Sequence, residues 1–448
     1  MKAHKKTAAA LALFSAFALF AAPVPTSGAE SPPPPCPCQR ARAAFHIDES
    51  LRPVRLTVNT HHFVDYDEGE AVLRCSRSIV SFVGNPAELH VEALQKALWD
   101  YSTEAAEKQQ KRRETLLPRA RGERAEKRAA GATSFYAYLD MNDVLVRRAD
   151  TLAVSLLETG YNYEGGVHGM SGVFGRNFDA KTGQTLSLSD VILDKSRLAS
   201  VIREQLVREY PEAAFAESGG ASIAETLDKY IGNDKICWTL DPTGVSFYFN
   251  PYLIGAYSEG IFSTTVLFAE HPELFAEKYC RAPLSYCMEL RSYLPVRAAF
   301  ADGGCAQVRL TTSDGGLRIV KDGAILDDWG ETRDLRPVLV SLADGRRYLY
   351  VDGVGAGDAW ERTAVYDLNG GAPVRVPMKH QFTRRADVDE DFAEAERGQV
   401  IIDENRDKVF YIMADPEHFY MTLLDEETGT ARLCECRVGA DGAPEIIR

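Results

Sequence analysis

Hydrophobic and polar residues alternate over short segments in the first third of the chain. Val54, Leu56 and Val58 are separated by polar residues, which is the two-residue period of a half-buried strand. The same reasoning predicts further strands at residues 79–83, 135–139, 143–148 and 152–157. Several neighbouring strands joined by short turns favour an antiparallel sheet.

A helix is predicted to begin at Asn85-Pro86, because apolar residues then recur at close to helical spacing through Leu89, Leu94 and Leu98. It continues into a charged stretch, residues 108–128, in which Lys and Arg are interleaved with Glu. Interleaved opposite charges favour a solvated helix broken at Pro118, or a mobile insertion, over a basic docking patch.

The middle of the chain combines helices and strands. Helical spacing of apolar residues predicts helices at 196–210 and 222–231, and Ser189 is typical of a helix N-cap. Strand-like segments follow at residues 237–240, 245–249 and 261–268, and a short helix at His271-Pro272. The expected fold class is α+β, with an antiparallel sheet and helices packed on one side.

From about residue 282 the pattern changes to short strands separated by Gly- and Asp-rich turns. Residues 338–342 with 348–351, and residues 363–368 with 374–376, have the pattern of paired strands. Fewer than 170 residues are too few for a complete propeller of about 40 residues per blade. We therefore predict a mostly-β C-terminal domain that is a sandwich or partly propeller-like.

The N-terminus has the pattern of a secretory signal peptide. Lysines precede an apolar core at residues 8–22, and small residues end the segment at Ser27-Gly28-Ala29. Retention as a membrane anchor is the alternative, but the apolar run is shorter than the ~20 residues of a spanning helix. We expect a secreted or periplasmic protein with no transmembrane helix after cleavage. The predicted parts are the signal peptide 1–29, a Pro-rich linker 30–50, an N-terminal α+β part 51–150, an α+β domain 151–281 and a β-rich domain 282–448.

Charge and cysteine content narrow the expected partners and environment. The formal charge is −14, which repels nucleic acid and favours cationic partners. Nine cysteines in an exported chain indicate disulfides, with at least one cysteine left over, and Cys280 and Cys287 are spaced to close a short loop. The alternative is a metal bound by the terminal Cys-x-Cys pairs. The cysteines are Cys36, Cys38, Cys75, Cys237, Cys280, Cys287, Cys305, Cys434 and Cys436.

Two motifs stand out in the middle of the chain. The first is Gly165-Gly166-Val167-His168-Gly169, followed by residues 177–183 (NFDAKTG) and 186–190 (LSLSD). It predicts a sharp reversal between two strands. The second is Phe247-Tyr248-Phe249-Asn250-Pro251-Tyr252, followed by Ile254, Gly255, Tyr257 and Gly260.

Together these motifs resemble a domain of unknown function shared by two kinds of envelope protein. One is the extracellular part of RsiV-like lysozyme-sensing anti-sigma factors, and the other is the non-catalytic N-terminal part of PdaC-like peptidoglycan deacetylases. The resemblance covers residues 51–275, is strongest at 155–268, and leaves out the last third. It implies a non-catalytic binding protein whose ligand is a lysozyme-like protein or a peptidoglycan fragment. The expected binding residues are Gly165, Gly166, His168, Gly169, Tyr252 and Tyr257.

Three features of the sequence bear on catalysis and metal binding. The chain lacks the Asp-Asp and His-x-x-x-His zinc motifs of a deacetylase, so that activity is not implied. An envelope hydrolase with a site near His168, beside Glu164 and Asp179, or between the two domains is the alternative function. The run Asp387–Asp391 begins like a calcium loop, but Phe392 stands where Gly is required. We expect no cofactor and no metal, and the sequence leaves the oligomeric state open.

Overall fold

The computed structural model describes residues 46–447 except 292–293, 300–304, 314–315, 323, 329–333, 355–361, 370–373, 381–399, 404–409, 413–414 and 425–430. The predicted signal peptide, most of the Pro-rich linker, Cys36, Cys38 and the acidic run Asp387–Asp391 lie outside these residues. The described chain is α+β, as predicted from the hydrophobic pattern.

A six-stranded sheet forms the first part, in the order β20-β2-β3-β4-β5-β6. Neighbouring strands run antiparallel except β3 and β4, which are parallel. The long helix α1 (Glu92–Ala129) connects these two strands, and a parallel pair needs such a crossover. The strands are β2 (Leu56–Asp67), β3 (Glu70–Phe82), β4 (Tyr138–Ala149), β5 (Ala153–Tyr163), β6 (Met170–Asp179) and β20 (Val400–Asp403).

Strands from both sides of residue 150 thus pair in this one sheet, since β4 is hydrogen-bonded to β5 along most of its length. The predicted strands at 135–139 and 143–148 form the single strand β4, although Phe135 itself precedes it. Asn85 caps a 3₁₀ turn, Pro86–Glu88, so that α1 begins at Glu92 and not at Pro86.

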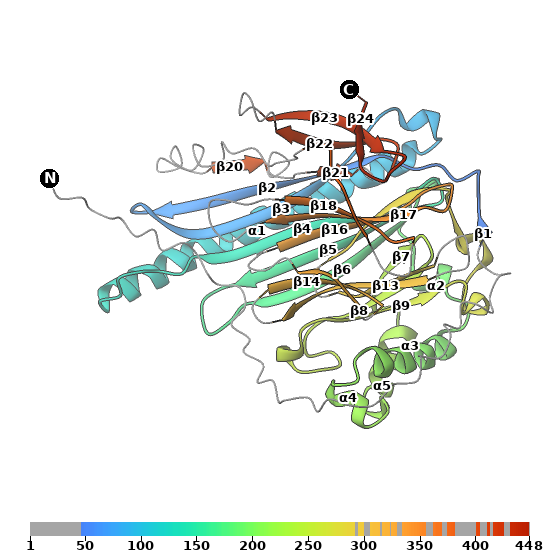
Figure 1. Cartoon of the computed structure of the whole chain (residues 1–448). Coiled ribbons are helices and arrows are strands. Elements are labelled where there is room, and N and C mark those ends of the chain that lie inside the picture. The colour runs from blue at the N-terminus through green and yellow to red at the C-terminus, as the bar shows by residue number, and fades with distance from the viewer. Residues whose placement is uncertain are drawn as a thin grey trace, which may run out of the picture. The chain divides into compact units, whose positions relative to one another are not determined.

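Helix α1 lies along one face of this sheet (Figure 1). It runs through Pro118 without a break, which corrects the expectation of a broken helix or mobile insertion in residues 108–128. Leu94 and Leu98 pack into the core with strand residues, while arginines further along the helix bind carboxylates of the sheet. We call these contacts the arginine clamp; they join Arg112 to Asp140, Arg113 to Asp65, Arg124 to Asp67, Glu68 and Glu70, and Arg128 to Glu70.

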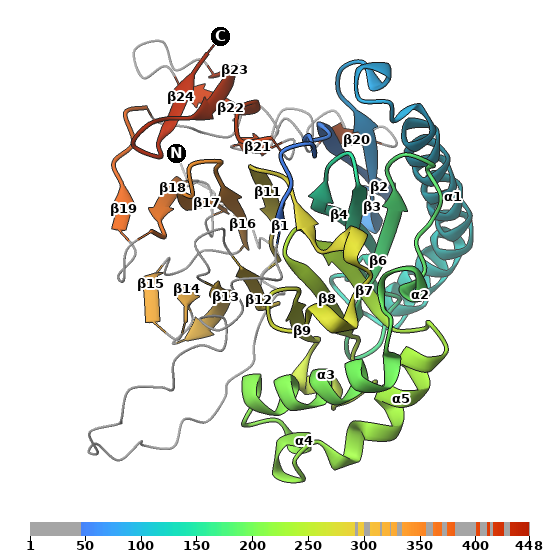
Figure 2. The same ribbon diagram turned by 90° about the vertical axis from the view of Figure 1, so that its right-hand side faces the viewer.

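A second, three-stranded sheet packs against a group of helices (Figure 2). It consists of β7 (Cys237–Asp241), β8 (Gly244–Phe249) and β9 (Phe262–Leu267), close to the predicted segments. The helices are α2 (Leu188–Val191), α3 (Lys195–Glu209), α4 (Ala214–Glu217) and α5 (Ala224–Gly232). Ser187, not Ser189, is the N-cap of α2, where it forms a capping box with Asp190. His271 precedes only a 3₁₀ turn, Pro272–Leu274.

The last third folds as three antiparallel sheets. The central one has the order β11-β16-β17-β18-β19 and exposes neither face, because alternate side chains pack in opposite directions. Leu339, Leu349 and Tyr366 pack toward the β12–β15 sheet, and Val340 and Tyr350 pack toward β22 and β23. This layered arrangement of short meanders agrees with the predicted mostly-β C-terminal domain.

The strands of the last third are as follows. The central sheet contains β11 (Tyr286–Glu289), β16 (Asp334–Ser341), β17 (Arg347–Val354), β18 (Arg362–Asp367) and β19 (Val374–Val376). The other two sheets contain β12 (Val296–Ala299), β13 (Cys305–Ser313), β14 (Gly316–Lys321), β15 (Ala324–Asp328), β21 (Phe410–Ile412), β22 (Phe419–Leu424), β23 (Ala431–Val438) and β24 (Pro444–Ile446). A short parallel pair joins β1 (His46–Ile47) to β10 (Arg281–Ala282).

Two consecutive arginines of β4 hold several elements together. A register shift between Val146 and Arg148 turns the side chains of Arg147 and Arg148 both inward, where each is 1% exposed. Arg147 binds both carboxylate oxygens of Asp241 in β7 and donates to the main-chain oxygen of Glu289 in β11, at 2.7 Å. Arg148 binds Asp150 and the main-chain oxygen of Arg281. These residues, the buried arginine pair, tie β4 to both later parts of the chain.

The cysteines whose side chains the structure describes form no disulfide. Cys280 and Cys287, predicted to close a loop, both carry free thiols, as do Cys75, Cys237 and Cys436. Burial raises the pKa of the Cys75 and Cys237 thiols to about 12. These thiols therefore act as small buried hydrophobic groups.

Over the described residues, no helix is both long and apolar enough to cross a membrane; α1 has the length but is rich in charge. The same residues contain no group of three or more His, Cys, Asp or Glu side chains placed to hold a metal ion.

Candidate binding surface

The Gly165–Gly169 loop joins β5 to β6, as the sequence predicts. Gly165 and Gly166 both have positive φ, at 83° and 91°, which L-residues with a side chain rarely adopt. A Cβ on Gly165 would also lie 2.6 Å from Glu123 Oε2 of α1. The first glycine is therefore required both by the reversal of the chain and by the close approach of the helix.

The Asn250-Pro251-Tyr252 motif forms a tight turn. Leu253 N donates to Asn250 O at 3.0 Å, Pro251 occupies the second position, and Tyr252 follows with φ +70°. That position of such a turn normally takes Gly or Asn, because a bulky side chain is strained there. Strain of this kind costs on the order of 1–3 kcal/mol and persists where the surrounding contacts impose it.

The side chain of Asn250 attaches this turn to the edge of the six-stranded sheet. Its Oδ1 accepts from Val173 N at 2.8 Å and its Nδ2 donates to Val173 O at 3.1 Å. The amide thus satisfies both main-chain groups of one β6 residue, as a neighbouring strand would. This pairing places the second motif beside the first.

Three rings then join the two motifs. His168 stacks on Tyr257 with ring centroids 4.2 Å apart, and Tyr257 stacks on Tyr252 at 5.7 Å. The Tyr257 hydroxyl donates to Gly169 O at 2.5 Å, and His168 Nδ1 lies 2.9 Å from the same oxygen. Burial, then the nearby hydroxyls of Tyr161 and Tyr252, raise the pKa of Tyr257. We call Tyr252, Tyr257 and His168 the aromatic stack.

Apolar side chains around the stack are unusually exposed. Val167, at the tip of the loop, is 99% exposed, and Tyr252 is 62% exposed. Met170 and Phe174 point from β6 and are 41% and 54% exposed. Isolated exposed apolar residues are ordinary, but Val167 and Met170 flank the loop residues His168 and Gly169, and Tyr252 belongs to the stack. Exposed apolar side chains that gather in this way are typical of interaction sites.

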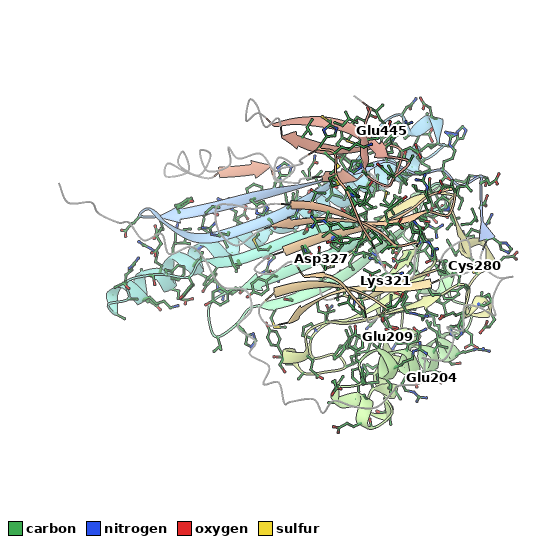
Figure 3. All side chains as sticks on the ribbon, in the orientation of Figure 1. Glu204, Glu209, Cys280, Lys321, Asp327 and Glu445 are labelled. Carbon is green, nitrogen blue, oxygen red and sulfur yellow. The ribbon has the colours of Figure 1, made fainter. Side chains whose placement is uncertain are left out.

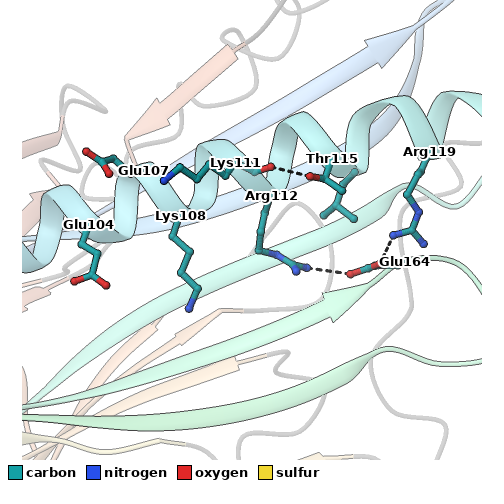
Figure 4. Close-up of a pocket in the computed structure, with 9 residues that line it drawn as sticks. Glu104, Glu107, Lys108, Lys111, Arg112, Thr115, Arg119 and Glu164 are labelled. Carbon is teal, nitrogen blue, oxygen red and sulfur yellow. Dashed lines mark hydrogen bonds and ion pairs between the residues drawn. The ribbon is translucent and has the colours of Figure 1, made fainter.

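A charged groove with a volume of 490 Å³ lies along α1, and Glu164, the residue before the Gly165–Gly169 loop, helps to line it (Figure 4). Glu164 accepts from Arg112 at 3.0 Å and from Arg119 at 2.7 Å across this groove. Burial raises the pKa of Glu164, but the two arginines outweigh it and the pKa is lowered. The groove is lined by Glu104, Glu107, Lys108, Lys111, Arg112, Thr115, Leu116, Arg119 and Glu164.

The predicted binding residues therefore come together, although they are far apart in sequence. Gly165, Gly166, His168 and Gly169 form one side of the surface, and Tyr252 and Tyr257 form the other. Sequence reasoning missed Asn250 as the residue that joins them, and it missed the exposed side chains of Val167 and Phe174. Nothing in the alternating pattern of β6 distinguishes Phe174 from a core residue.

The surroundings of His168 do not resemble those of a general base. Glu164 is bound by two arginines, and Asp179 lies at the far end of β6, where it binds the turn at Thr182. In the described chain, the contacts of the His168 ring are the Tyr257 ring and the Gly169 main-chain oxygen. The arrangement can bind a surface, but it does not bring a carboxylate to the imidazole.

Comparisons with known proteins agree with part of this picture. Residues 189–269 match the family described as protein of unknown function (DUF3298). No curated protein matches the chain. A solved member of the DUF3298 family from Bacteroides fragilis is similar over 50% of this chain and 94% of its own, at 16% identity and a TM-score of 0.36. A DUF3298 family protein from Pseudomonas aeruginosa is similar over 52% and 98%, at 15% identity and a TM-score of 0.31. The matched residues 189–269 include the Asn250–Gly260 part of the surface.

Proposed function

We propose that this protein is a secreted or periplasmic, non-catalytic binding protein of the cell envelope, and that it recognises a lysozyme-like protein through the aromatic stack and its exposed apolar neighbours. The observation that carries the proposal is the union of the two motif loops into one surface with exposed Val167, Met170, Phe174 and Tyr252. Aromatic residues and Met are enriched where proteins bind one another.

The form of the stack supports a protein ligand over a peptidoglycan fragment. A sugar ring packs on an open aromatic face, yet the Tyr257 ring already stacks with both His168 and Tyr252. Its hydroxyl is also used within the loop. The fully exposed Val167 offers an apolar tip that suits a cleft in a protein better than the hydroxyl groups of a glycan.

Charge and sequence resemblance support a cationic partner. The formal charge of −14 attracts positively charged proteins, and lysozymes are commonly cationic. The resemblance of residues 155–268 to lysozyme-sensing ectodomains points the same way. The secretion of the protein rests on the N-terminal pattern of Lys2, Lys5 and Lys6 before an apolar core.

Binding of the purified protein to immobilised hen-type lysozyme, over a salt series and with soluble peptidoglycan fragments as competitor, tests the proposal. Tyr252→Ala should weaken binding by about tenfold or more, because central aromatic anchors contribute at least about 1.4 kcal/mol each. Trp99→Ala is the matched control: Trp99 is 71% exposed on α1, roughly 35 Å along the helix from the Glu123 contact with Gly165. Binding that is absent, or equally weakened by both variants, would refute the proposal.

A further inference from the structure

A carboxyl group with one buried oxygen lies at the end of α3, which packs against β9, and near Arg297 of β12. Glu209 is the last residue of α3 (Figure 3), and its Oε1 is buried without a hydrogen-bond partner. A buried ionised carboxylate that lacks partners is costly, so such a group either finds a cation or keeps its proton.

The nearest cation is already used by another carboxylate. Arg297 of β12 donates through both terminal nitrogens to Glu270, whose side chain is 6% exposed. Arg297 also donates to the main-chain oxygen of Thr265 at 3.4 Å. If Glu209 ionised, two carboxylates would share one guanidinium in a site with little water.

The remaining contacts of Glu209 are polar but weak. The side-chain amide of Gln205 donates to Thr264 Oγ1 at 3.0 Å, and its oxygen accepts from Arg297 Nη1 at 3.3 Å. Because Thr264 Oγ1 accepts from Gln205, its own hydrogen is left to donate to Glu209. Arg208, on the same helix, is exposed and gives only modest charge compensation. Burial is the main influence and raises the pKa of Glu209 to about 7.

We propose that this joint between α3, β9 and β12 is a proton-operated switch, closed while Glu209 is protonated and loosened when Glu209 ionises. Tyr210 extends the joint, because its hydroxyl donates to Ser263 O in β9 at 2.9 Å. Arg297 and Ser263 lie at the point where residues 189–269 meet the β-rich last third. The switch acts on the packing of these two parts, and it does not depend on the proposed ligand.

The direction of the effect follows from the raised pKa. Between the ordinary value of 4.5 and about 7, the folded protein holds a proton that the unfolded chain has lost. The joint is therefore most stable below this range and loses stability as pH rises through 7. A carboxylate whose pKa is lowered by an ion pair does the opposite, since its contribution to stability is lost as pH falls.

Hydrogen exchange of the full mature chain at pH 6.0 and 8.5 tests the switch. After correction for intrinsic exchange, amides of residues 205–210 and 296–299 should exchange up to about tenfold faster at the higher pH, while amides of β5 should not change. Glu209→Gln mimics the protonated group and should remove the difference. Glu204→Gln, at an exposed position of the same helix, should retain it.

A carboxyl titration of wild-type protein carrying ¹³C-glutamate provides a second measurement that requires no variant to fold. The Glu209 resonance is identified as the one that is missing in Glu209→Gln, and its titration midpoint should lie near pH 7. If that variant does not fold, one glutamate resonance of the wild type should still titrate near pH 7, well above the others. A set of glutamates that all titrate below about pH 5.5, or an unchanged pH difference in Glu209→Gln, would overturn the proposal.

Discussion

Two regions of this molecule use the same contact, arginine to carboxylate, in opposite surroundings. In the arginine clamp, α1 binds acidic residues of β2, β3 and β4 and of the turn between β2 and β3, and several of these groups are exposed to solvent; Arg112 and Glu68 are 37% and 81% exposed. In the buried arginine pair, Arg147 and Asp241 are each 1% exposed. The two regions therefore differ in how far their charged groups are exposed to water.

The comparison teaches that the surroundings decide what such a contact does. At the clamp, water and salt screen the exposed contacts, so that these pairs add little, while less exposed contacts such as that of Arg113 with Asp65 add more. In the buried pair, the loss of hydration offsets much of the attraction. The contribution of this contact to stability is therefore seen mainly when one partner is removed, because the other charge then remains buried alone.

The largest expected effect on stability is that of breaking the buried contact between Arg147 and Asp241. Arg147→Met removes the cation that binds the buried Asp241 carboxyl group, which keeps the hydroxyl groups of Thr239 and Ser246 as donors, and it also removes the donor to Glu289 O. We expect a loss of about 3–5 kcal/mol in the free energy of unfolding, measured by urea denaturation. The double variant Arg147→Met/Asp241→Leu should recover at least half of that loss. A loss below about 1 kcal/mol would show that the pair is not isolated from water.

A clamp contact should give an intermediate effect. Arg113 is 17% exposed and binds both oxygens of Asp65, which is 7% exposed. Arg113→Gln should lower the free energy of unfolding by about 1.5–3 kcal/mol, as for other hydrogen bonds to charged groups. This difference should shrink in 1 M NaCl, whereas that of Arg147→Met should not. Equal salt dependence of the two variants would contradict the distinction.

The same two regions show what could be predicted from the sequence. By contrast with these regions, the spacing of apolar residues predicted the bounds of α3 and α5 to within two residues, because each helix buries one apolar face. The charges of residues 108–128 were conspicuous, but their partners, such as Asp65 and Glu70, lie on strands far away in sequence. Arg147 and Arg148 gave no signal at all. Consecutive strand residues normally face opposite ways, and only the register shift in β4 turns both inward.

The candidate surface was predictable to a similar degree. The glycines of residues 165–169 indicated a reversal, and the Asn-Pro-Tyr sequence indicated a turn. That both motifs would meet depended on the Asn250 amide pairing with Val173, which no local pattern reveals. The positive φ of Tyr252 was also hidden, since it is imposed by tertiary contacts against the preference of the residue.

A smaller effect, with a defined pH dependence, is expected at Glu123. Hydrogen bonds from Lys127 and Tyr138 lower the pKa of this carboxyl group. Its contribution to stability is thus present above the unfolded pKa, near 4.5, and is lost as pH falls through the folded pKa. Glu123→Gln should cost about 0.5–1 kcal/mol at pH 7 and almost nothing at pH 3, measured by urea unfolding at both values. A cost that persists at pH 3 would mean that shape, not charge, is what Glu123 supplies beside Gly165.

The smallest effect is expected where the same kind of pair is fully solvated. Lys96 and Asp100 have the same four-residue spacing on α1 as Lys127 and Glu123, but their side chains are 76% and 58% exposed. The lysine also lies toward the positive N-terminal end of the helix, and alanine is the better helix former. Lys96→Ala should therefore stay within about 0.3 kcal/mol of the wild type in urea unfolding at low salt. A loss near that of Glu123→Gln would show that spacing on the helix, and not burial, sets the contribution of these ion pairs, and the contrast between clamp and buried pair would lose its physical basis.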